Sequence, residues 1–64
     1  MKTFDELPQE LKSEIIQECG TDMYGLKPDT LYRNIANSTG TNESLANIFE
    51  VETTLVDEIK KINS

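Results

Sequence analysis

Closely spaced carboxylates are the side chains of this sequence that most directly suggest chemistry. They occur in three pairs: Asp5 and Glu6, Glu50 and Glu52, and Asp57 and Glu58. Two neighbouring carboxylates can perform general acid–base catalysis, provided that one of them is desolvated in a pocket. A chain of 64 residues has little room for such a pocket, and solvated helix faces account for the pairs. We therefore expect no catalytic residues and no enzyme activity.

The single cysteine and the absence of histidine exclude several kinds of functional site. Cys19 has no second cysteine with which to form a disulfide, and the chain contains no histidine. A zinc site and the usual proton shuttle near neutral pH are therefore not expected. Cys19 follows Glu18 at the expected end of a helix, far from the helix N-termini and cations that activate thiols. We interpret it as a small buried apolar residue and predict no metal and no cofactor.

Acidic residues outnumber basic ones along the whole chain. Twelve Asp and Glu stand against six Lys and Arg, which gives a net charge of −6. Residues 1–27 and residues 28–64 each contain six acids and three bases, so no acidic tail is set against a basic domain. Because Lys and Arg contacts to phosphate normally dominate affinity for polyanions, the composition excludes nucleic-acid binding through bulk charge.

The length allows one domain over residues 1–64. A domain this short buries only about 60% of the surface of its unfolded chain, so a homodimer is a reasonable expectation. No apolar run approaches the ~20 residues that span a membrane, and the first residues lack the apolar stretch of a secretory signal. We expect a reduced, cytoplasmic protein that has no contact with membranes.

Four helices are the simplest interpretation of the apolar spacing, and no β-hairpin pattern is present. The first helix is expected to begin near Pro8, which suits a first turn, and to end at Gly20 in a left-handed conformation. Its apolar residues recur at helical spacing: Leu11, Ile15, Ile16 and Cys19. Phe4 and Leu7 are expected to fold back over the start of this N-terminal helix, which takes up residues 1–20.

A loop over residues 21–27 leads to the second helix. This helix is expected to begin at Pro28 or Asp29 and to stop at Gly40. Its inward residues have helical spacing: Leu31, Tyr32, Ile35 and Ala36. Tyr24, in the loop, and Tyr32 are either anchors of an interface, where tyrosine is enriched, or covers of the core.

The third and fourth helices complete an all-α domain, with three helices over residues 28–64 following the N-terminal one. The third is expected from Thr41 or Asn42, both suitable N-caps, to Phe49. The fourth begins near Thr53, which can cap it, and runs to about Ile62. Spacing alone assigns four residues of this helix to the core: Leu55, Val56, Ile59 and Ile62.

Residues 43–61 contain the pattern that says most about the fold. Their apolar residues fit two short helices meeting at a tight corner: Leu45, Ala46, Phe49, Val51, Val56 and Ile59. Residues 29–62 resemble the trihelical, homeodomain-like helix-turn-helix domains of small phage and bacterial regulators. Those domains often read Leu-Ala-x-x-Phe-Gly-Val-Ser-x-x-Thr-Val-x-x-Ile-Lys. The resemblance covers about half of the chain and implies a second helix that lies in the DNA major groove.

Three positions depart from that pattern. Glu50 replaces the turn glycine, which implies modest backbone strain or a different corner. Glu52 replaces the serine that usually caps the second helix, so Thr53 is expected to provide the cap instead. Leu55 replaces a threonine, and the resemblance then places it on a partly exposed face, where it suits a protein partner better than a phosphate.

The resemblance also implies a DNA-facing surface. Its candidate DNA-binding residues are Thr53, Thr54, Lys60, Lys61 and Arg33. Asp57 and Glu58 face the same groove and oppose phosphate, and Arg33 is the only arginine for bidentate reading of guanine. The first interpretation is a small DNA-binding regulator, encoded by a phage or a mobile element, in which a homodimer doubles the few cationic contacts.

The alternative interpretation is an acidic interaction module. It would bind and inhibit or recruit a protein partner, as a phage-type inhibitor or a nucleic-acid mimic does. Its candidate contact residues are Leu55, Asp57, Glu58 and Glu50. A second, shorter resemblance links residues 7–16, Leu-Pro-Gln-Glu-Leu-Lys-Ser-Glu-Ile-Ile, to the opening of an F-box, although the later tryptophan of that motif is missing.

Overall fold

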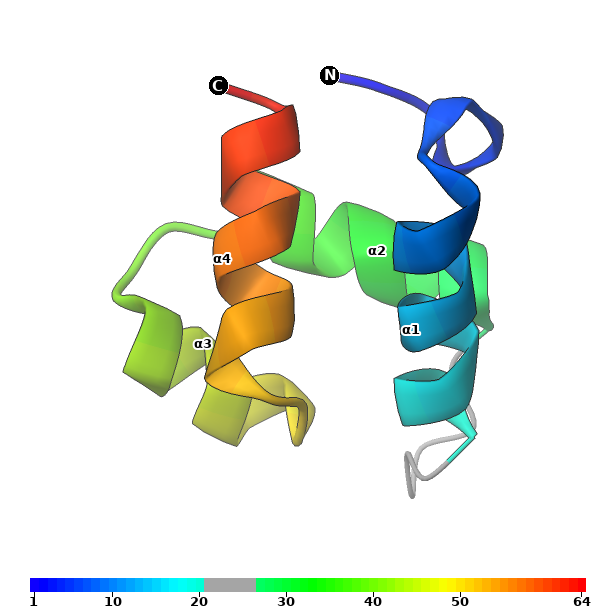
Figure 1. Cartoon of the computed structure of the whole chain (residues 1–64). Helices are drawn as coiled ribbons and strands as arrows, with labels where there is room; N and C mark the ends of the chain where they lie inside the picture. The colour runs from blue at the N-terminus through cyan, green and yellow to red at the C-terminus, as the bar shows by residue number, and fades with distance from the viewer. Residues whose placement is uncertain (21–26) are drawn as a thin grey trace.

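The computed structural model describes residues 1–20 and 27–64 of the chain. These residues form a short 3-10 turn, η1 (Phe4–Glu6), and four α-helices, and they contain no strand. The helices are α1 (Gln9–Cys19), α2 (Pro28–Asn37), α3 (Asn42–Phe49) and α4 (Thr53–Ile62). The all-α class and the four predicted helices are thus confirmed (Figure 1).

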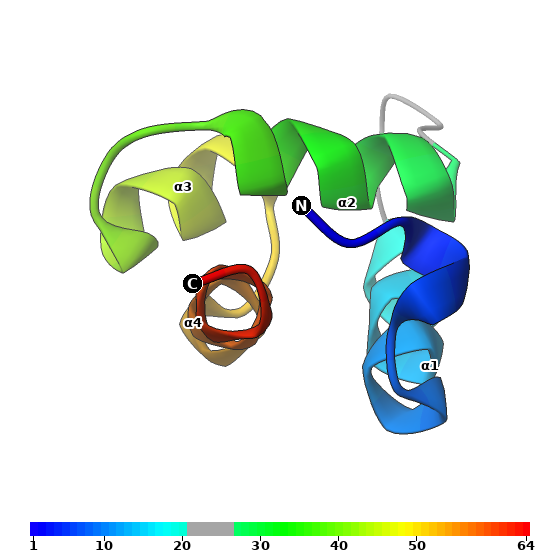
Figure 2. The ribbon, with the colours of Figure 1, turned by 90° about the horizontal axis from the view of Figure 1, so that it is seen from above.

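Helix α2 crosses behind the other helices and joins them. Figure 1 shows α1 and α4 in front of it, and the chain runs in opposite directions through the two. Seen from above, α3 packs on the side of α4 that faces away from α1 (Figure 2). Because α2 contacts α1, α3 and α4, its inward residues lie at the centre of the core.

The core consists of apolar side chains from all four helices. The buried residues are Leu7, Leu11, Ile15, Cys19, Leu31, Tyr32, Ile35, Leu45, Ala46, Leu55, Val56 and Ile59. Leu7 is buried in the core and Phe4 packs against it, with its ring beside Tyr32 of α2. The inward placement of Ile16 was wrong: its side chain is 52% exposed. The buried face of α1 follows Leu11, Ile15 and Cys19 at four-residue spacing, and Ile16 lies about 100° around the helix from Ile15.

Tyr32 belongs to the core. Its side chain is fully buried between the helices, which favours the core reading of this residue over that of an exposed anchor. The ring of Phe4 lies 6.3 Å from the ring of Tyr32, at a tilted angle of 60°. Such an arrangement is favourable for aromatic pairs. The expectation for Tyr24 concerns a position outside the described residues.

The roles expected for two glycines were wrong, although α1 does end at Gly20 and α2 ends within residues 37–40. Gly20 follows α1 with a φ of −62°, so it does not provide the left-handed end that was expected. Helix α2 stops at Asn37, and the extended backbone of Ser38 ends it before Gly40 is reached. Gly40 lies further along the connection with a φ of 137°, a conformation that other residues rarely adopt. Its role is therefore to turn the connection toward α3.

The corner between α3 and α4 is built around Glu50. This residue has left-handed backbone angles, with a φ of 56° and a ψ of 47°. The N–H of Val51 then donates to the carbonyl of Ala46 at 3.0 Å, which closes the end of α3. Phe49 and Val51 pack against the core from either side of Glu50. The predicted nesting of these apolar residues at a sharp bend is present.

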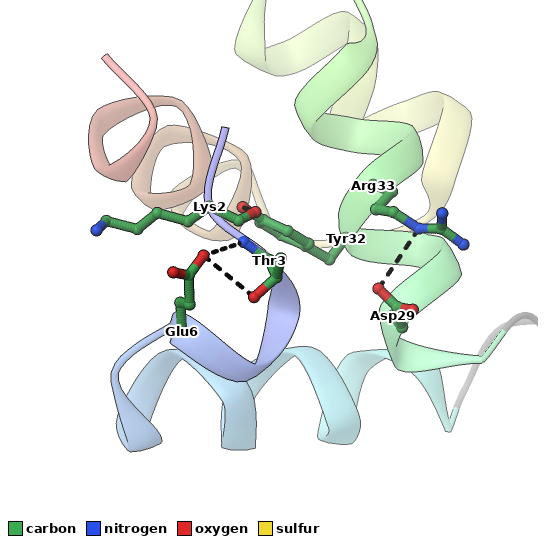
Figure 3. A network of polar contacts seen from close by, with 6 residues as sticks. All are labelled: Lys2, Thr3, Glu6, Asp29, Tyr32 and Arg33. Carbon is green, nitrogen blue, oxygen red and sulfur yellow. Dashed lines mark hydrogen bonds and ion pairs between the residues drawn. The ribbon is translucent and has the colours of Figure 1, made fainter.

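A polar network fixes the N-terminal residues to α2 and to the end of α4. The hydroxyl of Tyr32 donates to the carbonyl of Lys2 at 2.6 Å, and the N–H of Lys2 donates to Oδ1 of Asn63 at 2.9 Å. Nδ2 of Asn63 in turn donates to the Tyr32 hydroxyl at 3.1 Å. Figure 3 shows how Lys2 meets Tyr32 beside η1, where the N–H of Thr3 donates to the Glu6 carboxylate at 2.8 Å. Residues 61 positions apart are joined in this way.

Candidate functional site

The outward face of α4 contains most of the residues that the sequence singled out. Thr53, Thr54, Glu58 and Lys61 are exposed, while Asp57 and Lys60 are half-buried. The opposite face carries Leu55, Val56 and Ile59, and the side chains of all three are fully buried. This amphipathic spacing fixes the rotation of α4, so the polar residues must face outward.

Two expectations about α4 were wrong. Leu55 is fully buried, not partly exposed, because it lies one helical turn before Ile59 on the inward face. It therefore cannot contact a partner. The N-cap of α4 is Glu52 rather than Thr53, and Thr53 is the first residue of the helix. Glu52 makes no side-chain cap bond, so the family's serine cap has no hydroxyl replacement here.

The three candidate cations all have partners within the chain. Nζ of Lys61 lies 3.0 Å from Oδ2 of Asp57, and Nε of Arg33 lies 3.4 Å from Oδ1 of Asp29. Lys60 donates from Nζ to the carbonyl of Gly40 at 2.7 Å. Each of the two ion pairs presents no net charge to a phosphate, so only Lys60 retains an uncompensated positive charge among these candidates.

Arg33 does not join the outward face of α4. Its side chain lines a hollow of about 300 Å³ with Asp29 and residues 1–5, and no residue of α4 lines that hollow. Figure 3 shows Arg33 directed away from the α4 ribbon. The structure thus groups Thr53, Thr54, Lys60 and Lys61 on one helix and leaves Arg33 apart.

A groove between α1 and α4 gathers acidic residues from both helices. We call it the α1–α4 seam and define its rim by five carboxylates: Glu10, Glu14, Glu18, Glu52 and Glu58. One part of the seam, of about 480 Å³, is lined by Glu10, Glu14 and Glu58 with Leu11 and Ile62 beneath them. An adjoining part of about 350 Å³ is lined by Glu14, Gln17, Glu18 and Glu52. Among residues 1–20 and 27–64, the only cation that lines either part is Lys61.

The α1 side of this seam was not among the predicted site residues. Glu10, Glu14 and Glu18 follow one another at four-residue spacing, which places them on one stripe of a helix. Like charges at this spacing destabilise an isolated helix by a few tenths of a kcal/mol. Helix stability therefore does not explain why three glutamates repeat on this stripe. Only the packing of α1 beside α4 adds Glu52 and Glu58 to the same surface, and no spacing along the chain could have shown that.

The negative charge of the seam alters the titration of Glu58. Partial burial raises the pKa of this carboxyl above its usual range, and the nearby charge of Glu14 and a hydrogen bond between the two side chains raise it further. The charges of Asp57 and Glu10 act in the same direction. Asp57 behaves in the opposite way, because its hydrogen bond with Lys61 lowers its pKa. The pKa of Glu58 is thus raised by desolvation and by the neighbouring carboxylates together.

Glu18 holds the two helices together at one end of the seam. The backbone N–H of Glu52 donates to Oε1 of Glu18 at 3.3 Å. Glu52 precedes the first residue of α4, so the carboxylate of Glu18 lies at the positive end of the α4 dipole. Glu50 lies close by in sequence, is exposed at the corner, and lines neither part of the seam.

The described residues contain neither a metal-binding cluster nor a membrane-spanning helix. No group of three or more Cys, Asp and Glu side chains within residues 1–20 and 27–64 is arranged to hold a metal ion. No helix in the same part of the chain is long and apolar enough to cross a membrane.

Comparisons with protein-family models, with curated proteins and with solved structures found no match to this chain.

Proposed function

We propose that this chain is a non-catalytic, acidic interaction module that binds a basic protein partner. The observation that carries the proposal is the α1–α4 seam, where the described residues place five carboxylates and a single lysine around two hollows that share Glu14. Opposite potentials across an interface speed association and exclude partners of the wrong charge. A partner surface rich in Lys or Arg is the chemistry that complements this seam.

The charge distribution opposes a nucleic acid on the same surface. Duplex DNA is bound largely through release of counterions from phosphates that Lys and Arg neutralise. Lys61 and Arg33 are already paired with carboxylates of their own helices. A phosphate backbone placed along α4 would also approach Asp57 and Glu58 on its outward face. Both effects weaken the attraction on which DNA binding depends.

A DNA-binding regulator is the second candidate, and one observation favours it. Helices α3 and α4 meet at a sharp corner, and α4 presents Thr53, Thr54 and Lys61 outward. Hydroxyl groups and ammonium groups at such positions can contact phosphates. In that case Lys60 and Lys61 would exchange their internal partners for the DNA backbone.

Fluorescence anisotropy separates the two candidates. We expect a labelled lysine-rich peptide to bind at about 50 mM salt and to dissociate as salt rises, because the attraction is electrostatic. A labelled random duplex DNA is expected to show no binding under the same conditions. The proposal is overturned if the DNA binds, if Lys60→Ala with Lys61→Ala abolishes that binding, and if the peptide stays free.

A pull-down supplies a complementary test. The tagged protein, incubated with a nuclease-treated lysate, is expected to retain a stoichiometric partner of high isoelectric point that elutes with salt. Nuclease treatment removes proteins that are bridged only by nucleic acid. The absence of any stoichiometric basic protein from the retained fraction, across several lysates, contradicts the proposal.

A further inference from the structure

The α1–α4 seam is amphipathic as well as acidic. Its wider part has an apolar floor formed by Leu11, which is buried, and by Ile62, which is half-buried. Glu10, Glu14 and Glu58 stand around this floor. An apolar depression with a charged rim is the usual form of a groove that receives one face of an amphipathic segment.

Three of the rim carboxylates, Glu10, Glu14 and Glu58, form no ion pair with a Lys or Arg of residues 1–20 and 27–64. The ion pairs found there join Arg33 with Asp29 and Lys61 with Asp57, and neither involves Glu10, Glu14 or Glu58. Lys61, the one cation at the seam, is thus engaged by Asp57 at 3.0 Å. The pKa of Glu58 is raised first by desolvation and then by the charge of Glu14 and a hydrogen bond with its side chain. A cation brought to the rim from outside would relieve repulsion that the folded chain leaves in place.

The charge of the seam decides between possible occupants. A second copy of this chain placed over the seam would set glutamates against glutamates, and a nucleic acid would set phosphates against them. A basic segment of another protein is the occupant whose charge is complementary to the rim.

The dimensions of the seam favour a helical segment. The seam lies between two helices, and α1 contributes 11 residues, which corresponds to a length of about 16 Å. Glu10 and Glu14 are one turn apart on α1, so basic residues one turn apart on an opposing helix can meet both. A third helix laid between α1 and α4 would also cover Leu11 and Ile62, which line this part of the seam.

We infer that the α1–α4 seam binds one amphipathic basic helix of a partner protein. An apolar side chain of that helix rests on Leu11 and Ile62, and its Lys or Arg residues meet Glu10, Glu14 and Glu58. This inference rests on the proposed function. It adds which surface of this chain is bound and that the bound segment of the partner is a helix.

A set of labelled peptides tests the form of the partner. The probe is a peptide of about 16 residues, composed of Leu, Lys and Ala, with leucines on one helical face and lysines beside them. Its first control has the same composition in scrambled order, and its second replaces every leucine by alanine. We expect both controls to bind about tenfold more weakly in anisotropy titrations, because neither can place an apolar residue on the floor.

Two double variants of matched charge test the surface. Glu14→Gln with Glu58→Gln removes two charges from the rim, whereas Asp5→Asn with Glu43→Gln removes two from exposed positions outside the seam. The first variant is expected to weaken binding of the amphipathic peptide about tenfold at about 50 mM salt, and the second by less than about twofold. Backbone amide shifts in an NMR titration are expected to move along α1 and α4 and to remain fixed in α3.

The outcomes separate this inference from the proposed function. If all basic peptides bind alike and the two double variants weaken them equally, the seam inference is overturned while the acidic module stands. If shifts move in α3 instead of along α1 and α4, the surface is likewise wrong. If no basic peptide binds, the proposed function is wrong, and the inference that rests on it is wrong as well.

Discussion

At Glu50 the chain adopts a conformation that suits glycine better than any residue with a side chain. Its φ of 56° and ψ of 47° close α3 and aim the chain at α4. A non-glycine residue in this region carries roughly 1 kcal/mol or more of strain. The family pattern places glycine at this corner, and the backbone angles at Glu50 agree with the strain that the substitution implies.

Replacing Glu50 with glycine is expected to stabilise the protein. We expect Glu50→Gly to raise the free energy of unfolding by about 0.5–1 kcal/mol, because relief of strain exceeds the added flexibility of the unfolded chain. Urea denaturation followed by circular dichroism measures the change. Glu50→Ala removes the same charge without relieving the strain, so an equal gain in that variant would assign the effect to electrostatics.

At the scale of the helix, caps and apolar spacing determine where each element begins and which face is buried. Thr41 precedes α3, and its hydroxyl accepts from the N–H of Ser44 at 3.1 Å. This bond satisfies one of the backbone donors that a helix start leaves unpaired. Helix α3 has only 8 residues, so it depends more on its cap than a long helix does.

Thr41→Ala is expected to lower the free energy of unfolding by about 1 kcal/mol, because the N–H of Ser44 loses its acceptor. Thr41→Ser retains the hydroxyl and should stay near the wild type. Thermal denaturation of the three proteins gives the comparison. A loss of equal size in Thr41→Ser would show that the methyl group of Thr41, and not its hydroxyl, stabilises the start of α3.

Helix starts were predictable from the sequence because caps and spacing are local. The starts of α2, α3 and α4 follow from Pro28, Thr41 and the apolar positions of the last helix. Spacing alone placed Leu55 correctly in the core. The resemblance to helix-turn-helix domains then misplaced it, because burial depends on the rotation of α4. The predictions for Gly20 and Gly40 were wrong because a glycine permits a left-handed turn without requiring one.

At the scale of the molecule, the central feature is the juxtaposition of α1 and α4. The sequence contained the glutamate stripe of α1 and the acids of α4, but their meeting depends on tertiary packing through α2. The candidate site was therefore predictable only in small part: of its five carboxylates, Glu58 was named as a contact residue, whereas Glu10, Glu14, Glu18 and Glu52 were not. The charge of the whole molecule suggested the type of partner that we propose, without indicating the surface.

The seam also makes stability depend on pH. Glu58 has a pKa above its ordinary value of 4.5 in the folded protein, so the folded state binds its proton more tightly than the unfolded state does. The stability that this adds is fully present below pH 4.5 and is lost as the pH rises through the raised value. Asp57 and Glu6 have lowered pKa values, so their contributions are present above 3.8 and 4.5 respectively and are lost at lower pH.

We expect the melting temperature to rise as the pH falls from neutral toward the ordinary glutamate pKa, and to decline under more acidic conditions. Glu58→Gln is expected to be more stable than the wild type at neutral pH and to show a smaller rise on acidification, because it cannot gain a proton. Melting curves recorded across this pH range provide the measurement. Identical profiles for the two proteins would remove Glu58 as the source of the dependence.

The bonds among Lys2, Tyr32 and Asn63 have a consequence for how the folded chain loosens. Tyr32 is held in the core, and it joins a backbone carbonyl at residue 2 to a side chain at residue 63. Neither terminal segment can fray alone, since release of one removes the hydrogen-bond partner of the other. Hydrogen exchange should therefore show the amides of η1 and of the last turn of α4 opening with a common free energy, and Tyr32→Phe should lower both together.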